Sequence, residues 1–327
     1  MLLASGAIVL GLLILVWGAD RFVMGAASLA RNLGVSPLLI GLTIVGLGTS
    51  APEILVSAMA AMQGNPGLAV GNAVGSNIAN IGLILGVSAL VAPLVVKSGV
   101  LRREYPLLLL VSFGVYLLLI DGHLGLLDGI LMLAGLAATL LTLIHLGRQR
   151  AEIDPLEQEF SDEIRTDLST SAAVLWFMVG LVLLLVASRM LVWGAVSIAT
   201  TFGVSDLVIG LTIVAIGTSL PELAASLASN LKGEDDIAVG NVIGSNIFNM
   251  LAVLSLPGLF APTTIEESVL TRDFPLMLGL TIALFILGRG RKGNGHINRL
   301  EGSLLLACFI AYQGWLYIEA QPRLMGA

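Results

Sequence analysis

Apolar runs of about 20 residues recur almost from end to end of this chain, and they constrain its fold more than any other feature. A helix needs about 20 mostly apolar residues to cross the hydrocarbon core of a bilayer. Only 12% of the 327 residues are charged, against about 25% in soluble domains. The sequence therefore predicts an all-α polytopic membrane protein. Its ten expected transmembrane helices are 2–19, 38–62, 67–92, 105–120, 124–146, 171–188, 207–231, 237–260, 274–288 and 300–319.

A polar stretch divides these ten runs into two sets of five. It covers 147–170 and reads GRQRAEIDPLEQEFSDEIRTDLST. We expect a first five-helix half at 1–146, an acidic linker at 147–170 and a second five-helix half at 171–327. Of the 16 Lys and Arg residues, 13 fall in loops that follow odd-numbered runs. Because basic residues gather in cytoplasmic loops, we predict that the linker is cytoplasmic and that both termini lie outside.

The two halves contain an internal repeat. Residues 34–86 and 203–255 align without a gap at a constant offset of 169, and 27 of the 53 aligned positions are identical. An odd number of predicted spans separates the copies, so they must be inverted relative to each other. Inverted repeats are typical of secondary transporters, whose substrate site lies at the repeat interface near the midplane.

One glutamate stands inside an apolar run of each repeat copy, at Glu53 and Glu222. A charge at the centre of a membrane helix costs roughly 2.5–3.5 kcal/mol. Neither repeat helix carries a Lys or Arg that could pair with its carboxylate, so an exchangeable cation is the simplest compensation. The alternatives are a permanently protonated glutamic acid or a structural hydrogen bond.

A proline precedes each glutamate, at Pro52 and Pro221. A proline inside a helix removes one backbone hydrogen bond and frees the carbonyl four residues earlier, here that of Gly48 or Gly217. Unwound backbone is tolerated in a membrane where it lines a cavity. The two segments therefore predict an all-oxygen site of carboxylates, hydroxyls and carbonyls, with a simple kink as the alternative.

The spacing of further polar residues favours convergence on this site. Residues three or four apart share a helix face, which places a threonine and a serine beside each glutamate. The next helix of each copy carries polar residues at every fourth position. We expect ligands among Thr49, Ser50, Ser76, Asn80, Thr218, Ser219, Ser245 and Asn249. Interhelical hydrogen bonding is an equal alternative for Asn72, Asn77, Asn241 and Asn246.

The ligand types indicate a hard cation. Neither repeat copy contains Cys or His, which disfavours soft metals. Calcium accepts six to eight oxygens in flexible geometry, whereas magnesium demands an octahedron. Two carboxylates neutralise one Ca²⁺ or two Na⁺, a physical basis for exchange. We expect no cofactor, and the lone Cys308 is interpreted as a small buried hydrophobic residue.

At these residues the chain resembles the calcium/cation antiporter superfamily, and especially its bacterial sodium/calcium exchanger branch. The motifs are GLTIVGLGTSAPE and GNAVGSNIAN in the first half, with GLTIVAIGTSLPE and GNVIGSNIFN in the second. The resemblance implies two inverted five-helix halves. It implies that Glu53 and Glu222 bind Ca²⁺ together with the carbonyls of Thr49 and Thr218. The implied Na⁺ ligands are Ser50, Ser219, Ser76, Ser245, the carbonyls of Gly46 and Ala215, and the same glutamates.

The expected function is therefore exchange of Ca²⁺ for Na⁺ by alternating access in a bacterial inner membrane, without enzymatic activity. A Ca²⁺/H⁺ antiporter and a passive cation channel are the alternatives. Some relatives carry Asp where this chain has Asn249, which leaves stoichiometry and potassium coupling open. Membrane lipid is an expected partner. We expect no obligate protein partner, and the absence of a basic cluster argues against nucleic acid.

Overall fold

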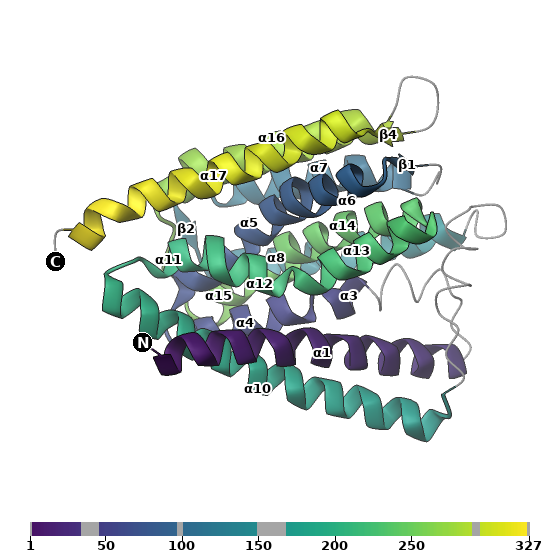
Figure 1. Cartoon of the computed structure of the whole chain (residues 1–327), viewed down its shortest axis with the longest axis horizontal. Helices are drawn as coiled ribbons and strands as arrows, with labels where there is room; N and C mark the ends of the chain where they lie inside the picture. The colour runs from purple at the N-terminus through teal and green to yellow at the C-terminus, as the bar shows by residue number, and fades with distance from the viewer. Residues whose placement is uncertain (1, 34–45, 97–100, 149–167, 290–294, 326–327) are drawn as a thin grey trace.

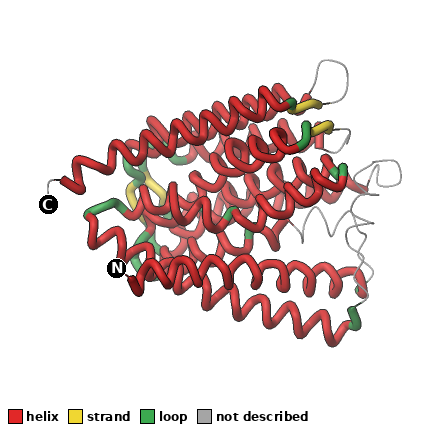
Figure 2. The backbone as a smooth tube through the Cα atoms, in the orientation of Figure 1, coloured by secondary structure: helices red, strands yellow, loops and turns green. Residues whose placement is uncertain are grey.

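The computed structural model describes residues 2–33, 46–96, 101–148, 168–289 and 295–325, and nearly all of them are helical (Figure 2). The elements up to the predicted linker are α1 (Leu2–Asn32), α3 (Gly46–Thr49), α4 (Ala51–Met62), α5 (Pro66–Ala79), the π-helix η2 (Asn80–Leu85), α6 (Gly86–Val91), β1 (Leu94–Val96), α7 (Leu101–Leu118), β2 (His123–Leu124) and α8 (Leu126–Arg148).

The second part of the chain repeats this order. Its elements are α10 (Thr170–Phe202), α11 (Asp206–Ile209), the π-helix η3 (Gly210–Val214), α12 (Ala215–Thr218), α13 (Leu220–Lys232), α14 (Asp235–Phe248), the π-helix η4 (Asn249–Val253), α15 (Ser255–Phe260), β3 (Thr263–Thr264), the π-helix η5 (Val269–Asp273), α16 (Phe274–Arg289), β4 (Gly295–Ile297) and α17 (Arg299–Met325). The predicted linker 147–170 lies almost entirely outside the described residues.

Six helices of the described chain are long and apolar enough to cross a membrane: Leu2–Asn32, Pro66–Val91, Thr170–Ile198, Asp235–Phe260, Val269–Gly288 and Arg299–Ala320. A seventh candidate is the pair Asp206–Thr218 and Leu220–Lys232, which is bent by 41°. The predicted runs 38–62, 105–120 and 124–146 contain the further apolar helices α4, α7 and α8, which are not among these candidates. The predicted run 38–62 begins in residues outside those described. The count of ten spans therefore stays a prediction.

The helices form a layered bundle in which α1 and α10 pair along one side and α16 and α17 lie on the other (Figure 1). The α1–α10 pair packs closely because glycines face the partner backbone. A Cβ on Gly25 would clash with the backbone of Phe177, and a Cβ on Gly180 would clash with that of Phe22. Such small-residue contacts are typical of helix packing in membranes. The first residue of α1 and the last of α17 lie at the same end of the molecule (Figure 1).

Large apolar side chains cover the outward faces of the outer helices. Leu13 is 65% exposed, Val182 54% and Ile310 60%. Contiguous exposed apolar surface of this kind is rare on soluble monomers, and it is suited to contact with lipid. Cys308 also lies exposed on α17, so its interpretation as a buried residue was wrong. The apolar run around Cys308 did not distinguish a lipid-facing position from an inward-facing one.

Two short antiparallel strand pairs close the ends of the bundle. At one end β1 pairs with β4, with Val95 opposite His296. At the other end β2 pairs with β3, with His123 opposite Thr264. Each pair joins strands from opposite parts of the chain. The helices that follow make the same exchange, because α17 packs against α6 and η2 while α8 packs against α15 and η4.

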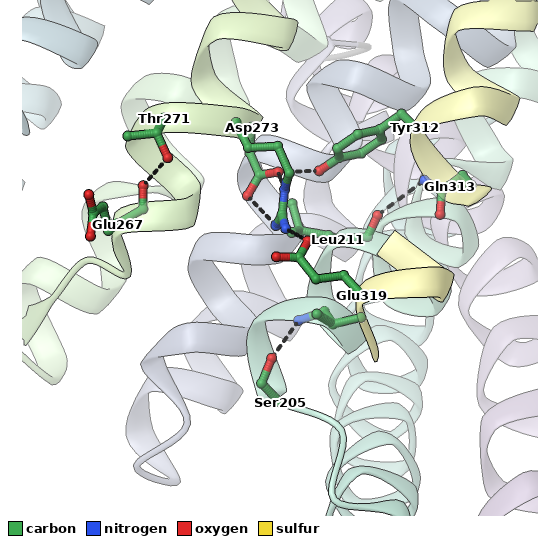
Figure 3. A network of polar contacts seen from close by, with 10 residues as sticks. Ser205, Leu211, Glu267, Thr271, Asp273, Tyr312, Gln313 and Glu319 are labelled. Carbon is green, nitrogen blue, oxygen red and sulfur yellow. Dashed lines mark hydrogen bonds and ion pairs between the residues drawn. The ribbon is translucent and has the colours of Figure 1, made fainter. Parts of the chain in front are cut away.

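A buried charge cluster ties α17 to η5 (Figure 3). The Arg272 guanidinium donates from Nε to Asp273 Oδ1 at 2.7 Å and from Nη2 to Asp273 Oδ2 at 3.1 Å. It also pairs with Glu319. The Tyr312 hydroxyl donates to Asp273 Oδ1 at 2.8 Å. These residues connect η5, which leads into α16, to the last helix, and they border the start of the second repeat copy at residues 204–208.

Candidate ion-binding site

Two broken helices carry the glutamates. The first break falls at Ser50 (φ −82°, ψ 2°), between α3 and α4. The second falls at Ser219 (φ −82°, ψ 4°), between α12 and α13. The prolines lie in the first turns of α4 and α13, so the helices are interrupted at the two proline motifs. Glu53 and Glu222 occupy the same first turns, where the positive end of the helix dipole favours a carboxylate.

The opposite walls are formed by α5 with η2 and by α14 with η4. Helix α5 packs against α4 and α14 against α13, whereas η2 packs against α13 and η4 against α4, the glutamate helix of the other copy. The π segments begin at Asn80 and at Asn249, the last polar positions of the two predicted stripes. Short π segments are frequent at functional sites, since the inserted turn disturbs the regular backbone ladder. The sequence repeat thus produces the same local irregularity twice.

Both carboxylates receive one serine hydroxyl. Ser219 Oγ donates to Glu53 Oε1 at 3.3 Å, across the two repeat copies. Ser245 Oγ donates to Glu222 Oε1 at 3.3 Å, within one copy. Ser50 lies beside Glu222 without a hydrogen bond of good geometry. The second carboxylate oxygen, Oε2, has no hydrogen-bond partner in either glutamate among the described residues.

The glutamates are fully buried, at 0% exposure, and close enough to repel each other. The ion pairs of Arg21 with Asp20 and of Arg272 with Asp273 and Glu319 do not involve a site glutamate. Buried carboxylates are normally paired or bind metal ions. These two carry hydroxyl partners only, which leaves them suited to a cation.

The other predicted side-chain ligands are buried too. Hydrogen bonds and close approach join most of them to the glutamates in one network: Thr49, Ser50, Ser76, Thr218, Ser219 and Ser245. Asn80 instead donates to Asn246 Oδ1 at 3.0 Å. Asn249 is fully buried, and neither polar side-chain atom has a partner among the described residues. Gly46 and Ala215 begin α3 and α12, one turn before the breaks.

Sequence reasoning missed two serines of this region. Ser57 and Ser226 are fully buried and accept hydrogen bonds from Asn72 at 2.9 Å and from Asn241 at 3.2 Å. Their signal was present, because each follows its glutamate by four residues and is identical in both repeat copies. The Arg272 cluster was also missed, since no local pattern indicates partners 39 or 47 residues apart.

No group of three or more His, Cys, Asp or Glu side chains gathers anywhere in the described ranges. The candidate site consists of two acids with hydroxyls and amides around them. Apolar spanning helices, lipid-suited outer faces and a buried acid pair on broken helices define an integral membrane transporter for cations. A resident metal centre would be expected to have more permanent ligands.

Comparison with known proteins gives the family. The family described as sodium/calcium exchanger protein matches residues 3–145 and 172–318, and the chain belongs to it. The chain is 51% identical over 317 residues to the putative antiporter CaxA of Alkalimonas amylolytica, covering 97% of this chain and 99% of that protein. It is 32% identical to the sodium/calcium exchanger MaX1 of Methanosarcina acetivorans, covering 93% and 96%.

Solved structures agree with this assignment. The sodium-calcium exchanger NCX_Mj, soaked with Na⁺ and Sr²⁺, superposes with a TM-score of 0.67 at 34% identity, covering 95% of this chain and 97% of that one. The chain thus has the membrane exchanger fold. Members of this family are transporters, and the protein is a cation exchanger of the calcium type, not an enzyme.

Proposed function

We propose that the protein exchanges Ca²⁺ for Na⁺ by alternating access, with Glu53 and Glu222 as the central ligands. The observation that carries this proposal is the buried pair of glutamates, each with one oxygen lacking a hydrogen-bond partner among the described residues. One Ca²⁺ or two Na⁺ would neutralise the pair, whereas an empty site would leave two repelling charges in a low-dielectric interior. The names of the related exchangers support sodium as the counter-ion.

The remaining ligands follow the motifs. We assign the carbonyls of Thr49 and Thr218 to calcium. We assign to sodium the hydroxyls of Ser50, Ser76, Ser219 and Ser245 with the carbonyls of Gly46 and Ala215. Asn80 and Asn249 complete the set of oxygens. The unpartnered amide of Asn249 supports a place for it in the site. The small residues and helix breaks would let several main-chain oxygens face one ion.

Alternating access would use two inverted halves, 1–146 and 171–327. The 169-residue offset, the paired helix breaks and the paired π segments support this arrangement. The common end of the first and last helices (Figure 1) supports an even number of spans. The distribution of Lys and Arg supports both termini outside and 147–170 cytoplasmic. We place the protein in the inner membrane of a bacterium.

The test is calcium uptake by vesicles that contain the purified protein. We expect an outward Na⁺ gradient to drive uptake and a pH gradient alone to drive little. Uptake driven by the pH gradient would instead identify a Ca²⁺/H⁺ antiporter. Flux without any counter-ion gradient would identify a passive channel.

Substitution of the glutamates tests the ligands themselves. Glu53→Gln and Glu222→Gln keep the shape of the side chain but remove half of the negative charge, so each should abolish sodium-driven uptake. Glu267→Gln is the matched control, since Glu267 is exposed, and it should transport normally. Retained exchange in either site variant, at normal protein insertion, would refute the role of that residue.

A further inference from the structure

The two threonines next to the helix breaks reach across to the opposite repeat copy. Thr218 Oγ1 donates to Asn72 Oδ1 at 3.0 Å, over a sequence separation of 146 residues. Thr49 Oγ1 donates to Asn241 Oδ1 at 3.1 Å, over 192 residues. Since residues 72 and 241 are equivalent in the repeat, as are 49 and 218, one contact is made twice.

The same asparagines hold the glutamate helix of their own copy. Asn72 Nδ2 donates to the Glu53 carbonyl at 3.2 Å and to Ser57 Oγ at 2.9 Å. Asn241 repeats this arrangement with the Glu222 carbonyl at 3.4 Å and Ser226 Oγ at 3.2 Å. Each amide therefore connects a glutamate on one side to a threonine of the opposite copy on the other.

These amides are already satisfied by the protein. Both N–H groups of Asn72 are used, and its oxygen accepts from Thr218 and, at 3.5 Å, from Ser76. An amide carries two donors and two acceptor positions, so Asn72 has no capacity left for an ion. Asn249 is the opposite case, with both atoms unpartnered among the described residues. Asn72 therefore differs from Asn249, because the hydrogen bonds of Asn72 are all made within the protein.

We propose that Asn72 and Asn241 are positioning residues that set the distance between the glutamate of one repeat copy and the threonine of the other. The inference rests on the proposed function, in which Glu53 with the Thr218 carbonyl, and Glu222 with the Thr49 carbonyl, surround the divalent cation. Four buried hydrogen bonds join Asn72 and Asn241 to the threonines and to the glutamate carbonyls. Few rearrangements could replace them. The amide contacts therefore fix the size of the oxygen ring and favour calcium over larger divalent cations.

The experiment compares ions rather than rates. Thr218→Val removes the hydroxyl at nearly constant shape and keeps the main-chain carbonyl, whereas Thr218→Ser keeps both. In vesicles with a fixed Na⁺ gradient, half-saturating concentrations are measured for Ca²⁺ and for the larger Ba²⁺. Thr218→Val should raise the half-saturating Ca²⁺ concentration by roughly fivefold, the effect of one lost hydrogen bond. The half-saturating Ba²⁺ concentration should stay within about twofold of the wild-type value. Thr218→Ser should retain the wild-type ratio.

A general loss of stability would weaken the binding of both ions alike. An unchanged ratio of the half-saturating Ca²⁺ and Ba²⁺ concentrations in Thr218→Val therefore overturns the proposal. Thr49→Val tests the equivalent contact independently and serves if Thr218→Val does not fold. Ser112→Ala is the control for a buried serine hydroxyl, because Ser112 lies on α7 and has no hydrogen-bond partner among the described residues.

A failure of the proposed exchange function would give a different experimental result. If the wild type shows no sodium-driven calcium uptake, the exchange proposal fails. The Asn72 and Asn241 proposal is then decided by Ca²⁺ and Ba²⁺ binding to the detergent-solubilised protein, measured by calorimetry. The same change in the ratio of dissociation constants is expected there, and its absence would reject the positioning role.

Discussion

The Arg272 cluster provides a stability test that is separate from ion binding (Figure 3). Tyr312 is 3% exposed and Asp273 is fully buried. In Tyr312→Phe the carboxylate loses the hydroxyl at 2.8 Å but keeps both contacts from Arg272. A hydrogen bond to a charged group contributes about 1.5–3 kcal/mol, and we expect that loss of unfolding free energy.

Asp273→Asn should cost more than Tyr312→Phe. It removes the charge that faces Arg272, whose side chain is only 9% exposed, and leaves the half-exposed Glu319 as the remaining acidic partner in the cluster. Breaking a buried ion pair by removing one partner costs about 3–5 kcal/mol. We therefore predict that Asp273→Asn loses more unfolding free energy than Tyr312→Phe.

The assay is unfolding in detergent micelles by added denaturing detergent, followed by helical circular dichroism. Tyr317→Phe is the control, because Tyr317 is 63% exposed on the same helix and should change stability by less than about 0.5 kcal/mol. The half-saturating Ca²⁺ concentration should stay at the wild-type value in all variants that fold. Equal stability of Tyr312→Phe and Tyr317→Phe would refute the reasoning, as would an Asp273→Asn protein as stable as Tyr312→Phe.

Two further predictions concern packing and charge. Gly71→Ala should destabilise the protein or abolish its insertion, because the added Cβ would clash with the Leu207 carbonyl. Gly244→Ala is the control and should be tolerated, because Gly244 has open space around it. Equal yields and melting temperatures of the two variants would contradict this prediction. Asn249→Asp adds a third carboxylate to a site with two that already repel each other. Sodium-driven calcium uptake should therefore fall more steeply with decreasing pH in this variant than in the wild type. An unchanged pH profile would place Asn249 outside the site.

Local chemistry explains which parts of the site were predictable. The prolines before Glu53 and Glu222 dictate broken helices, and the breaks at Ser50 and Ser219 follow. Polar residues at four-residue spacing predicted the facing stripes. Neither pattern could distinguish a satisfied amide from an unsatisfied one, because that depends on partners in the other copy. The sequence favoured Asn249 as a ligand and left hydrogen bonding as an equal alternative for Asn72, and the described structure shows Asn72 fully hydrogen-bonded and Asn249 without a partner.

The parts of the fold that the sequence did not predict also depend on tertiary contacts. Apolar runs locate helices well, but they did not predict where the helices end: α1 continues to Asn32 and α10 to Phe202, beyond the predicted ends at residues 19 and 188. Hydropathy reports composition, whereas helix ends depend on turns and tertiary contacts. The strand pairs β1–β4 and β2–β3 involve segments of two or three residues, too short for an alternating pattern to indicate them.

The exchanged partners of these strands argue that the two predicted halves fold together. The last helix of each part, α8 or α17, packs against the repeat copy of the other part, and a strand pair fixes each end. Gly86 and Gly302 approach closely at one of these contacts, as Gly129 and Ser255 do at the other. Either part alone would expose the repeat surface that the other covers. Expressed separately, 1–148 and 168–327 should therefore be unstable, and their co-expression should restore sodium-driven calcium uptake. A stable half that binds calcium alone would contradict this interdependence, because it would contain only one of the two glutamates.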